Sequence, residues 1–374
     1  MELYTDSKNT MLGLDDIALM PSAGCSSIKS RGDVNPYVYD KKLPYVPYAS
    51  ANRRLPVFVA PMTSVVCSEN LKDFVENGFT PVLPRTGAFE DRCEYSEDYW
   101  TAFSMKEFEK IIEENVPSSY EQMYVLVDVA NGHMQQLYDL VKRAKKAYSN
   151  IILMIGNIAD AHLYEECCKT GVDYVRVGIG GGSACTTSVQ TGIHVSLVDL
   201  IVEINKIRLK YDVPTKVIAD GGINTIDKAV KCIALGYDYV MMGKMFAQTY
   251  EACGEFRTHI VTADGHDLYA DNNILSVNRQ PVHFKGNFEK AFLERHYYGM
   301  ASEQGQKDIS GGFNKNPEGT DIWVKIEWPL EKLNMIMEST FRSAMSYTDS
   351  KDLQAFKESV FKQISPAEFN AYYK

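Results

Sequence analysis

Residues 216–243, KVIADGGINTIDKAVKCIALGYDYVMMG, form one complete unit of the pattern that decides the fold of this chain. Residues 216–219 and 239–242 are short apolar runs, which are typical of strands covered on both faces. Residues 227–235, between them, have the apolar spacing of an amphipathic helix. Strands joined through a helix pair in parallel, so this stretch predicts a βα-repeat protein.

The same unit recurs along the chain, which favours a closed barrel. Six more apolar runs have the character of strands, at residues 57–60, 81–83, 100–103, 123–127, 151–155 and 174–177. Amphipathic segments lie between most of them, as at residues 134–147, 163–170 and 197–210. Eight such units predict an α/β protein with the TIM, or (β/α)8, barrel fold. The alternative is an open doubly wound sheet, but no GxGxxG motif follows the first predicted strand.

Two segments interrupt the repeat in the carboxyl-terminal part. Residues 256–296 mix polar and aromatic side chains, and we expect them to leave the barrel as an insertion. Residues 302–319, SEQGQKDISGGFNKNPEG, are rich in Gly, Lys, Asn and Pro, which predicts a mobile flap near the site. With these two additions, residues 1–374 are predicted to be a single catalytic barrel domain.

Composition limits the class of partner. The chain has 374 residues, of which 45% are hydrophobic and 24% charged, as in ordinary globular proteins. Its net charge of −10 argues against non-specific binding to nucleic acid or to an anionic membrane, so we expect a small partner. It has neither a signal-peptide core nor a run of about 18 apolar residues, which predicts a cytoplasmic protein. The eight cysteines show no CxxC spacing, so reduced thiols are expected.

Polar residues and glycines gather just after the predicted strands. A barrel brings the carboxyl ends of its strands to one rim, where active sites are built. We therefore expect the residues at these ends to lie together. They are Met62, Asp128, Asn157, residues 178–187, Asp220, Gly221, Gly222 and Gly243.

The loop at residues 178–187, GIGGGSACTT, places a cysteine between glycines and hydroxyls. Successive glycines free backbone N–H groups for an anion, and Ser183 adds a hydroxyl donor, so the loop suits a phosphate. Cys185 in such a pocket could have a lowered pKa and act as a nucleophile, with Thr187 able to hold water or an attacking group. A tight turn around a buried cysteine is the simpler alternative.

Two further turns suit the rest of a nucleotide. Asp220 could bind sugar hydroxyls, while Gly221 and Gly222 leave room for phosphate oxygens at the start of a helix. Gly243 and Lys244 follow the last predicted strand, and Lys244 could add positive charge. Because the last two strands of a barrel commonly supply its phosphate site, these turns predict phosphate binding.

The chain resembles the IMP dehydrogenase/GMP reductase family of (β/α)8 barrels in ten motifs that follow the family's order. They are LDDIALMPS, VAPMTSV, DVANGH, MIGN, VRVGIGGGSACTT, IADGGI, YVMMGKMFA, YYGMAS, PEG and FRSAMSYT. The resemblance implies that the thiolate of Cys185 attacks C2 of a purine nucleoside monophosphate. It also implies that a hydride passes between C2 and a nicotinamide.

The resemblance also assigns binding roles to individual residues. For the substrate it implies that Ser183, Gly222 and Gly243 hold the phosphate, that Asp220 holds the ribose, and that Gly299 and Met300 meet the base, with Met62, Gly221 and Lys244 in the same site. For the cofactor it implies Arg85, Asp128 and Asn157. It implies a monovalent cation such as K⁺ on the carbonyls of Gly180, Gly182 and Cys185. It further implies a homotetramer.

Within the family the chain is more similar to GMP reductases. The flap of IMP dehydrogenases carries an Arg-Tyr pair, whereas residues 302–317 contain neither residue type, and no CBS domains interrupt the barrel. The resemblance implies that Thr187 and Glu303 help to expel ammonia from GMP, with NADPH as the reductant and IMP as the product. The alternatives are an IMP dehydrogenase without CBS domains that uses NAD and has an atypical flap, and an inactive nucleotide-binding barrel.

Four positions depart from the family pattern. Gly181 stands where the family has proline, and Lys244 stands where glycine or serine is expected. The family's MDTV motif appears as MTSV, with Thr63 in place of aspartate and Ser64 in place of threonine. These changes fall on the predicted phosphate and cofactor contacts.

Overall fold

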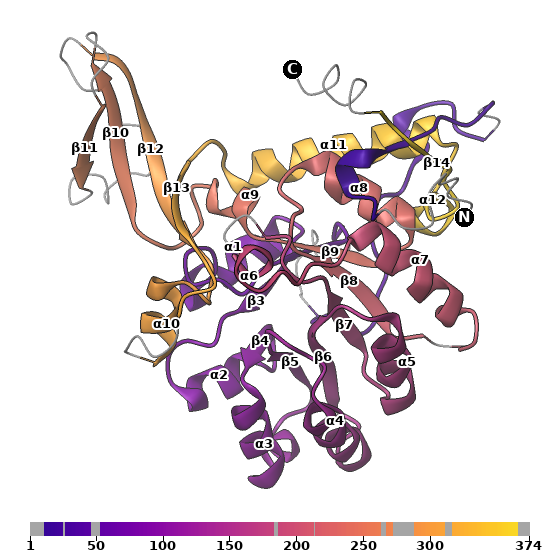
Figure 1. Ribbon diagram of the computed structural model, residues 1–374, viewed down its shortest axis with the longest axis vertical. Helices are drawn as coiled ribbons and strands as arrows, with labels where there is room; N and C mark the ends of the chain where they lie inside the picture. The colour runs from indigo at the N-terminus through magenta and orange to yellow at the C-terminus, as the bar shows by residue number, and fades with distance from the viewer. Residues whose placement is uncertain are drawn as a thin grey trace.

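A closed barrel of eight parallel strands forms the centre of the computed structural model, which describes residues 11–24, 27–45, 53–182, 186–212, 214–262, 267–271, 288–310 and 316–365 (Figure 1). The last strand pairs with the first, Val57 opposite Val240, so the sheet has no free edge. This confirms the predicted TIM barrel and excludes the open sheet. The strands are β2 (Val57–Val59), β3 (Thr80–Leu83), β4 (Trp100–Phe103), β5 (Met123–Asp128), β6 (Ile151–Ile158), β7 (Tyr174–Val177), β8 (Lys216–Asp220) and β9 (Tyr239–Met242).

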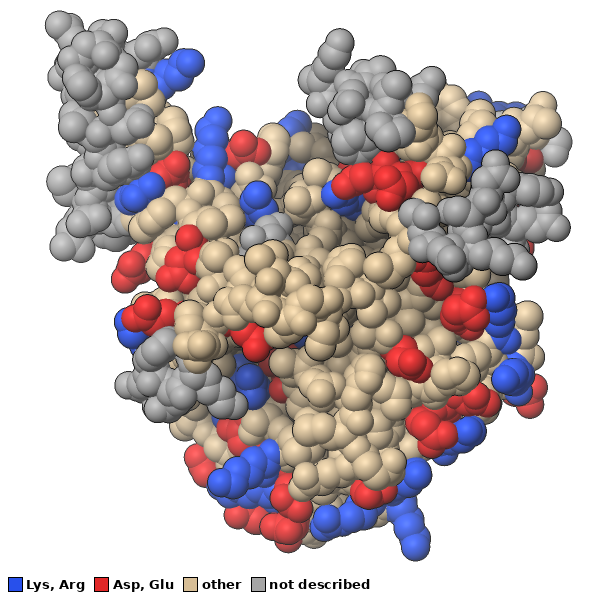
Figure 2. Space-filling model, in the orientation of Figure 1, with Lys and Arg blue, Asp and Glu red and all other residues tan. Residues whose placement is uncertain are grey.

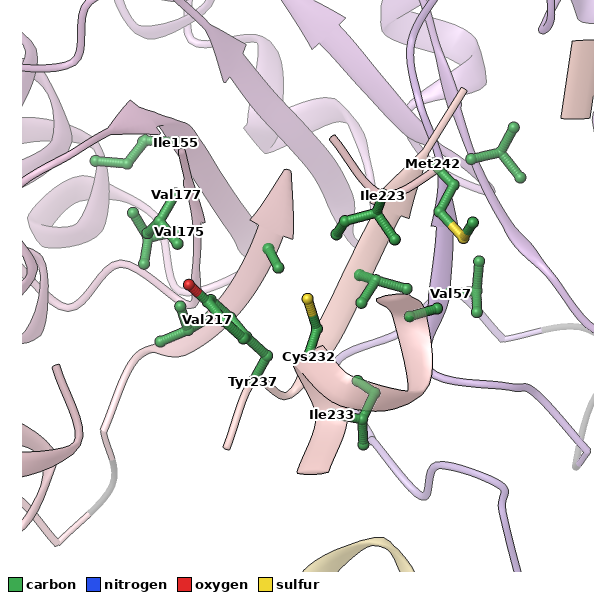
Figure 3. Close-up of a cluster of buried hydrophobic side chains, with 14 of the residues drawn as sticks. Val57, Ile155, Val175, Val177, Val217, Ile223, Cys232, Ile233, Tyr237 and Met242 are labelled. Atoms are coloured by element: carbon green, nitrogen blue, oxygen red, sulfur yellow. The ribbon is translucent and has the colours of Figure 1, made fainter. Parts of the chain in front are cut away.

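Helices pack around the outside of the barrel because each has one apolar face. In α4, for example, Leu137, Leu140, Val141 and Ala144 are buried against the strands, while Lys142 and Lys146 are exposed. Figure 3 shows part of this outer core, where Cys232 and Ile233 of α8 lie among side chains of the strands. The helices after the strands are α1 (Leu71–Glu76), α2 (Phe89–Tyr95), α3 (Met105–Glu113), α4 (Gln135–Ala147), α5 (Ala161–Thr170), α6 (Thr187–Thr191), α7 (Leu197–Arg208), α8 (Ile226–Leu235) and α9 (Lys244–Ala247).

The inside of the barrel contains a cluster of aromatic side chains among aliphatic ones. Phe58 meets Tyr239 edge to face with ring centroids 5.1 Å apart, and Trp100 meets Tyr174 at 5.2 Å. Because Trp100, Tyr174 and Tyr239 are the first residues of their strands, this cluster closes the amino-terminal end. The carboxyl-terminal end is left open for a site.

A buried aspartate ties the segment before the barrel to this closed end. Asp40 accepts hydrogen bonds from the hydroxyls of Tyr174 and Tyr239, at 2.6 and 2.7 Å, and from Nζ of Lys216 at 2.6 Å. Burial alone would raise the pKa of Asp40, but the charge of Lys216 and these three hydrogen bonds lower it overall. Asp40 is therefore an ionised group that joins strands β7, β8 and β9 at their starts.

A four-stranded antiparallel sheet, which we call the arm, projects from the barrel at the upper left of Figure 1. Its strand order is β11 (Asp267–Asp271), β10 (Phe256–Thr262), β12 (Phe288–Tyr298) and β13 (Asp321–Lys325). The described residues of the segment expected as an insertion, 256–296, thus fall in strands β10, β11 and most of β12. Arg295, only 3% exposed, anchors the arm by donating from Nη1 to the carbonyls of Cys253 and Gly254 at 3.0 and 2.9 Å.

The remaining elements complete the molecule. The expected flap contains α10 (Glu303–Ser310), which connects β12 to residues outside the described ranges and then to β13. Helix α11 (Leu330–Tyr347) packs on the barrel, α12 (Leu353–Phe356) follows, and β1 (Ile17–Leu19) pairs with β14 (Phe361–Gln363). None of the described helices has the length and apolar character needed to cross a membrane. On the face shown in Figure 2, the described Lys and Arg side chains are intermingled with Asp and Glu side chains rather than gathered into a basic stripe.

Candidate active site

A cavity of about 250 Å³ opens at the carboxyl-terminal end of the barrel strands. It is lined from several strand ends at once, which is how a barrel assembles a site. Most of the site residues expected from the sequence line it together: Met62, Asp128, Asn157, Gly180, Gly182, Asp220, Gly221, Gly222, Gly243, Lys244, Gly299 and Met300. Ser183 and Cys185 lie outside the described residues, so their roles stay predictions.

The glycine turns meet backbone to backbone at one side of this cavity. A Cβ on Gly178 would lie 2.2 Å from the carbonyl oxygen of Asp220, and Gly178 has a φ of +122°. Gly222 has a φ of +76°, and a Cβ there would lie 2.9 Å from the carbonyl oxygen of Gly181. Only glycine fits at both positions. The loop after β7 and the turn after β8 can therefore share one wall of the cavity.

Arg176 organises the polar side of the cavity. It is the third residue of β7, and its side chain is 9% exposed. Its Nη1 donates to Oδ1 of Asp128 at 3.0 Å, and its Nη2 donates to Oδ1 of Asn157 at 2.5 Å and lies 3.2 Å from Oδ2 of Asp220. One guanidinium thus joins the ends of strands β5, β6, β7 and β8.

Asn157 and Arg85 complete this polar network. Nδ2 of Asn157 donates to Oδ2 of Asp220 at 2.9 Å and to the carbonyl of Gly178 at 2.8 Å. Arg85 does not line the cavity, but its Nε lies 3.2 Å from Oδ2 of Asp128. Asp128 therefore sits between two guanidinium groups, and the predicted cofactor residues Arg85, Asp128 and Asn157 belong to one network.

Glu318 is the carboxylate that the structure places beside Thr187. The Thr187 hydroxyl donates to Oε2 of Glu318 at 2.8 Å, and the Thr186 N–H donates to the Glu318 carbonyl at 2.9 Å. Gln190 donates to the carbonyl of Pro317 at 2.7 Å, and the Glu318 N–H donates to the carbonyl of Ala301 at 3.0 Å. Glu318 also lines the cavity, so this segment joins the cysteine loop to the base of the flap.

Glu303, by contrast, is not brought to Thr187. It begins α10 with its side chain 58% exposed, and it forms an ion pair with Lys307 at 2.8 Å, one turn along the same helix. The flap region contains two glutamates, and the PEG motif at residues 317–319 was the signal for the other one. Of the two, Glu318 is the one that contacts Thr187.

Asp308 fixes α10 to the wall of the cavity. Its Oδ2 accepts from the Thr63 hydroxyl at 2.7 Å and from the Tyr298 hydroxyl at 2.8 Å, and its Oδ1 accepts from Gln304 at 2.9 Å. Burial raises the pKa of Tyr298, so this phenol stays protonated and donates. Thr63, a departure from the family motif, thus has a partner on the flap helix.

The expected cation would depend on the backbone rather than on side chains. Among the described residues, no group of three or more His, Cys, Asp or Glu side chains is arranged to hold a metal ion. The expected monovalent cation would use backbone carbonyls of Gly180, Gly182 and Cys185. That cation stays a prediction because Cys185 is outside the described ranges.

Comparison with known proteins places this chain in a family. The family model for the IMP dehydrogenase / GMP reductase domain matches residues 118–371. The chain belongs to this family. The matched range contains every predicted site residue except Met62 and Arg85, so the IMP dehydrogenase/GMP reductase assignment covers the loop after β7, the turn after β8 and the flap.

Individual relatives in the family carry two different names. A GMP reductase of Vibrio cholerae is 25% identical over 374 residues, which cover 96% of this chain and 97% of that protein. A GMP reductase of Staphylococcus epidermidis is 28% identical and covers 95% and 97% of the two chains. An IMP dehydrogenase of Chlorobaculum parvum is 31% identical over 65% of this chain, and this match spans 45% of the dehydrogenase's length.

The main polar residue that sequence reasoning missed is Arg176. It stands within YVRV, a strand that is otherwise apolar, where burial of a charge needs a partner. That isolated charge was the available signal. Its partners come from three other strands, so only the closed barrel identifies them.

Proposed function

We propose that this protein is a GMP reductase that converts GMP and NADPH to IMP, ammonia and NADP⁺. The observation that carries the proposal is the hydrogen bond from Thr187 to Glu318 at the edge of the cavity. A hydroxyl bonded to a carboxyl group is a proton relay of the kind that a departing amino group needs. Similarity to proteins named GMP reductase over 95–97% of both chains supports the same choice.

In the proposed mechanism the Cys185 sulfur bonds to C2 of the purine, and the 2-amino group leaves as ammonia. The amino group must gain a proton before it departs, and we assign that transfer to Glu318 acting through Thr187. We prefer Glu318 to Glu303 for this step, because the Glu303 carboxylate is exposed and pairs with Lys307 instead of Thr187. A bound nicotinamide would supply the hydride to C2, and loss of the sulfur then releases IMP.

The remaining cavity residues would position the nucleotide. Backbone N–H groups at Gly222 and Gly243, with Ser183 and the charge of Lys244, would bind the phosphate. Asp220 would take the ribose hydroxyls. Its carboxylate is already oriented by Arg176 and Asn157, which leaves little freedom for it to turn away from the cavity.

Two buried polar atoms at the cavity are free to bind a polar ligand such as a dinucleotide. Nε of Arg176 and Oδ1 of Asn224 are buried without a hydrogen-bond partner among the described residues, and both residues line the cavity. Buried polar atoms are normally paired, so a polar ligand is expected to satisfy them. Asp128 and Asn157 would face the nicotinamide end. Arg85 is the candidate for the 2′-phosphate that distinguishes NADPH from NAD.

An IMP dehydrogenase that oxidises IMP with NAD is the second candidate, and the 31% identity to a dehydrogenase favours it. Absorbance of reduced nicotinamide separates the two. A GMP reductase consumes NADPH when GMP is added, whereas a dehydrogenase forms NADH from IMP and NAD. Turnover only with IMP and NAD would reject the proposal. Nucleotide binding without turnover in either assay would instead indicate an inactive nucleotide-binding barrel.

We also propose that the enzyme works in the cytoplasm as a homotetramer of single-barrel chains, with a monovalent cation held by the cysteine loop. Light scattering after size-exclusion chromatography tests the assembly. Replacing K⁺ by Na⁺ and then by a bulky organic cation in the assay tests the cation, because only the carbonyl cage should distinguish ions of equal charge.

A further inference from the structure

Two cysteine thiols meet in a place that the proposed reaction does not use. Cys67 lies in the segment that follows β2 and Met62, and Cys253 lies in the turn between α9 and the arm. The N–H of Cys253 donates to the carbonyl of Val65 at 3.2 Å, which holds the two segments side by side. Residues far apart in the chain thus bring two cysteines to the same point of the fold.

One buried amide holds both cysteines in this arrangement. Asn70 is 5% exposed, and its Oδ1 accepts from the N–H of Cys67 at 2.9 Å. Its Nδ2 donates to the carbonyl of Val65 at 2.9 Å and reaches the sulfur of Cys253 at 3.6 Å. Asn70 therefore bonds to the backbone of one cysteine and to the sulfur of the other, so the fold itself holds the pair together.

The two thiols differ in how easily they ionise. The hydrogen bond from Cys253 lowers the pKa of Cys67, in spite of partial burial. The same hydrogen bond, together with burial, raises the pKa of Cys253. Because the thiolate is the reactive form, we assign the first reaction to Cys67 and the second to Cys253.

Cys67 and Cys253 are more exposed to solvent than most of the other described cysteines. Cys67 and Cys253 are both partly exposed, whereas Cys93, Cys167 and Cys232 are buried. Burial raises the pKa of Cys93 to about 11 and raises the pKa values of Cys167 and Cys232 further. A small oxidant should therefore reach Cys67 before it modifies these three.

We propose that Cys67 and Cys253 form a redox-active dithiol that a hydroperoxide converts to a disulfide. The Cys67 sulfur attacks one peroxide oxygen, the O–O bond breaks, and one water leaves when hydrogen peroxide is the oxidant. The Cys253 sulfur then attacks the resulting sulfenic acid, the S–O bond breaks, and a second water leaves. The two thiols lose two electrons and two protons, and one peroxide takes them up to become two waters.

The disulfide would link the loop after β2 to the segment between α9 and the arm. Cys67 continues the loop that carries Met62, while Cys253 continues the chain from Gly243 toward the arm, whose anchor Arg295 donates to the Cys253 carbonyl. The cross-link would therefore hold one cavity wall against the base of the arm. This inference does not depend on which nucleotide the protein converts.

Peptide mapping tests the dithiol directly. We would use the full chain with Cys185→Ser, so that the proposed nucleophile cannot contribute, and treat it with equimolar hydrogen peroxide. Free thiols are then blocked with N-ethylmaleimide and the protein is digested without reductant. The expected product is a linked pair of peptides containing Cys67 and Cys253, lighter than their sum by two hydrogen atoms and separated by dithiothreitol.

Two single variants assign the order of the steps. In Cys253→Ser, Cys67 should accumulate as a sulfenic acid that a dimedone probe labels. In Cys67→Ser, Cys253 should remain free for N-ethylmaleimide. Circular dichroism establishes that each variant is folded. The proposal is overturned if the folded protein yields no linked peptide and both thiols are recovered as N-ethylmaleimide adducts after peroxide treatment. It is also overturned if the two thiols of the parent chain are oxidised without becoming linked to each other.

Discussion

Glu318 and Glu303 show how the role of a single residue depends on its surroundings. Both are glutamates of the flap region, yet only the Glu318 carboxylate accepts from Thr187 and faces the cavity. Both side chains carry the same carboxyl group, so the sequence alone could not show which of the two glutamates contacts Thr187. The difference arises from a backbone path that folds residues 317–319 onto the loop after β7.

Replacing Glu318 tests the proposed proton relay. Loss of a positioned general acid typically costs about 10²–10⁴ in rate, so Glu318→Gln should lower kcat for GMP by that factor. The amide still accepts from Thr187, so the dissociation constant for GMP should change little. The control is Glu303→Gln, for which kcat should stay near that of the parent. Equal losses in the two variants would contradict the assignment.

Arg176 is the residue whose replacement should affect both stability and binding. A lysine at this position would keep the charge but could not contact Asp128, Asn157 and Asp220 together. We expect Arg176→Lys to reduce the free energy of unfolding by about 1.5–3 kcal/mol, the range for hydrogen bonds to charged groups, as measured with urea. It should also raise the KM for the dinucleotide.

The matched control for Arg176 is Arg143→Lys on the exposed face of α4, where the side chain is 53% exposed. That change should leave both measurements unaltered. If Arg176→Lys were as stable as the parent, Arg176 would not be the link between the strand ends.

At the scale of elements, the strands were largely predictable and the arm was not. Each of the eight predicted runs became a barrel strand, because a strand covered on both faces needs only a short apolar run. Strands β5 and β6 extend past their predicted ends to Asp128 and Ile158, which places Asp128 and Asn157 inside strands. The polar network accounts for the longer strands, because Arg176 donates hydrogen bonds to the side chains of both Asp128 and Asn157.

Helix starts follow the same logic. Residues 163–170 were expected to be helical, and α5 begins two residues earlier because Asp160 accepts from the N–H of His162 at 2.6 Å.

In the arm, β12 pairs with β13 across the whole flap region. Local sequence patterns carry no information about such a distant partner, which is why the sheet order could not be predicted.

Helix α10 should depend on one carboxylate for its position. In Asp308→Ala, the hydroxyls of Thr63 and Tyr298 and the amide of Gln304 lose their acceptor. The bonds from Thr63 and Tyr298 connect α10 to the segments that carry Met62 and Gly299, whereas the bond from Gln304 lies within the helix. At about 0.5–1.5 kcal/mol for each bond, the KM for GMP should rise roughly tenfold.

Hydrogen exchange distinguishes a released helix from a general loss of stability. In Asp308→Ala, residues 303–310 should exchange faster while the barrel strands keep their protection. Lys307→Ala, a change on the exposed side of the same helix, is the control and should alter neither quantity. Unchanged exchange in Asp308→Ala would show that other contacts hold α10.

At the scale of the whole molecule, the barrel is closed at one end and open at the other. Asp40 joins three strands at the closed end, and its pKa is lowered overall despite burial. A carboxyl group with a lowered pKa in the folded state adds stability above its ordinary pKa. That contribution is lost as the pH falls through the lowered value.

Asp40→Asn should therefore lower the free energy of unfolding by about 2–3 kcal/mol at pH 7, the upper part of the range for bonds to a charged group. The difference between parent and variant should shrink as the pH falls below about 4, because the Asp40 carboxyl group then becomes protonated in the unfolded chain, and it should vanish once the pH passes the lowered pKa of the folded state. Urea unfolding at a series of pH values measures it. A difference that does not vary with pH would mean that the Asp40 charge contributes nothing.

The flap joins two strands that are already hydrogen-bonded neighbours, with Tyr298 opposite Asp321. The ends of the flap therefore keep a constant spacing whatever its length, and a change of length need not disturb the pairing of β12 with β13. Segments of other lengths and compositions could be exchanged there. A replacement that keeps Asp308 and Glu318 would retain the contacts of the flap with Thr63 and Thr187, whereas one that lacks them would change the cavity and leave the strands paired.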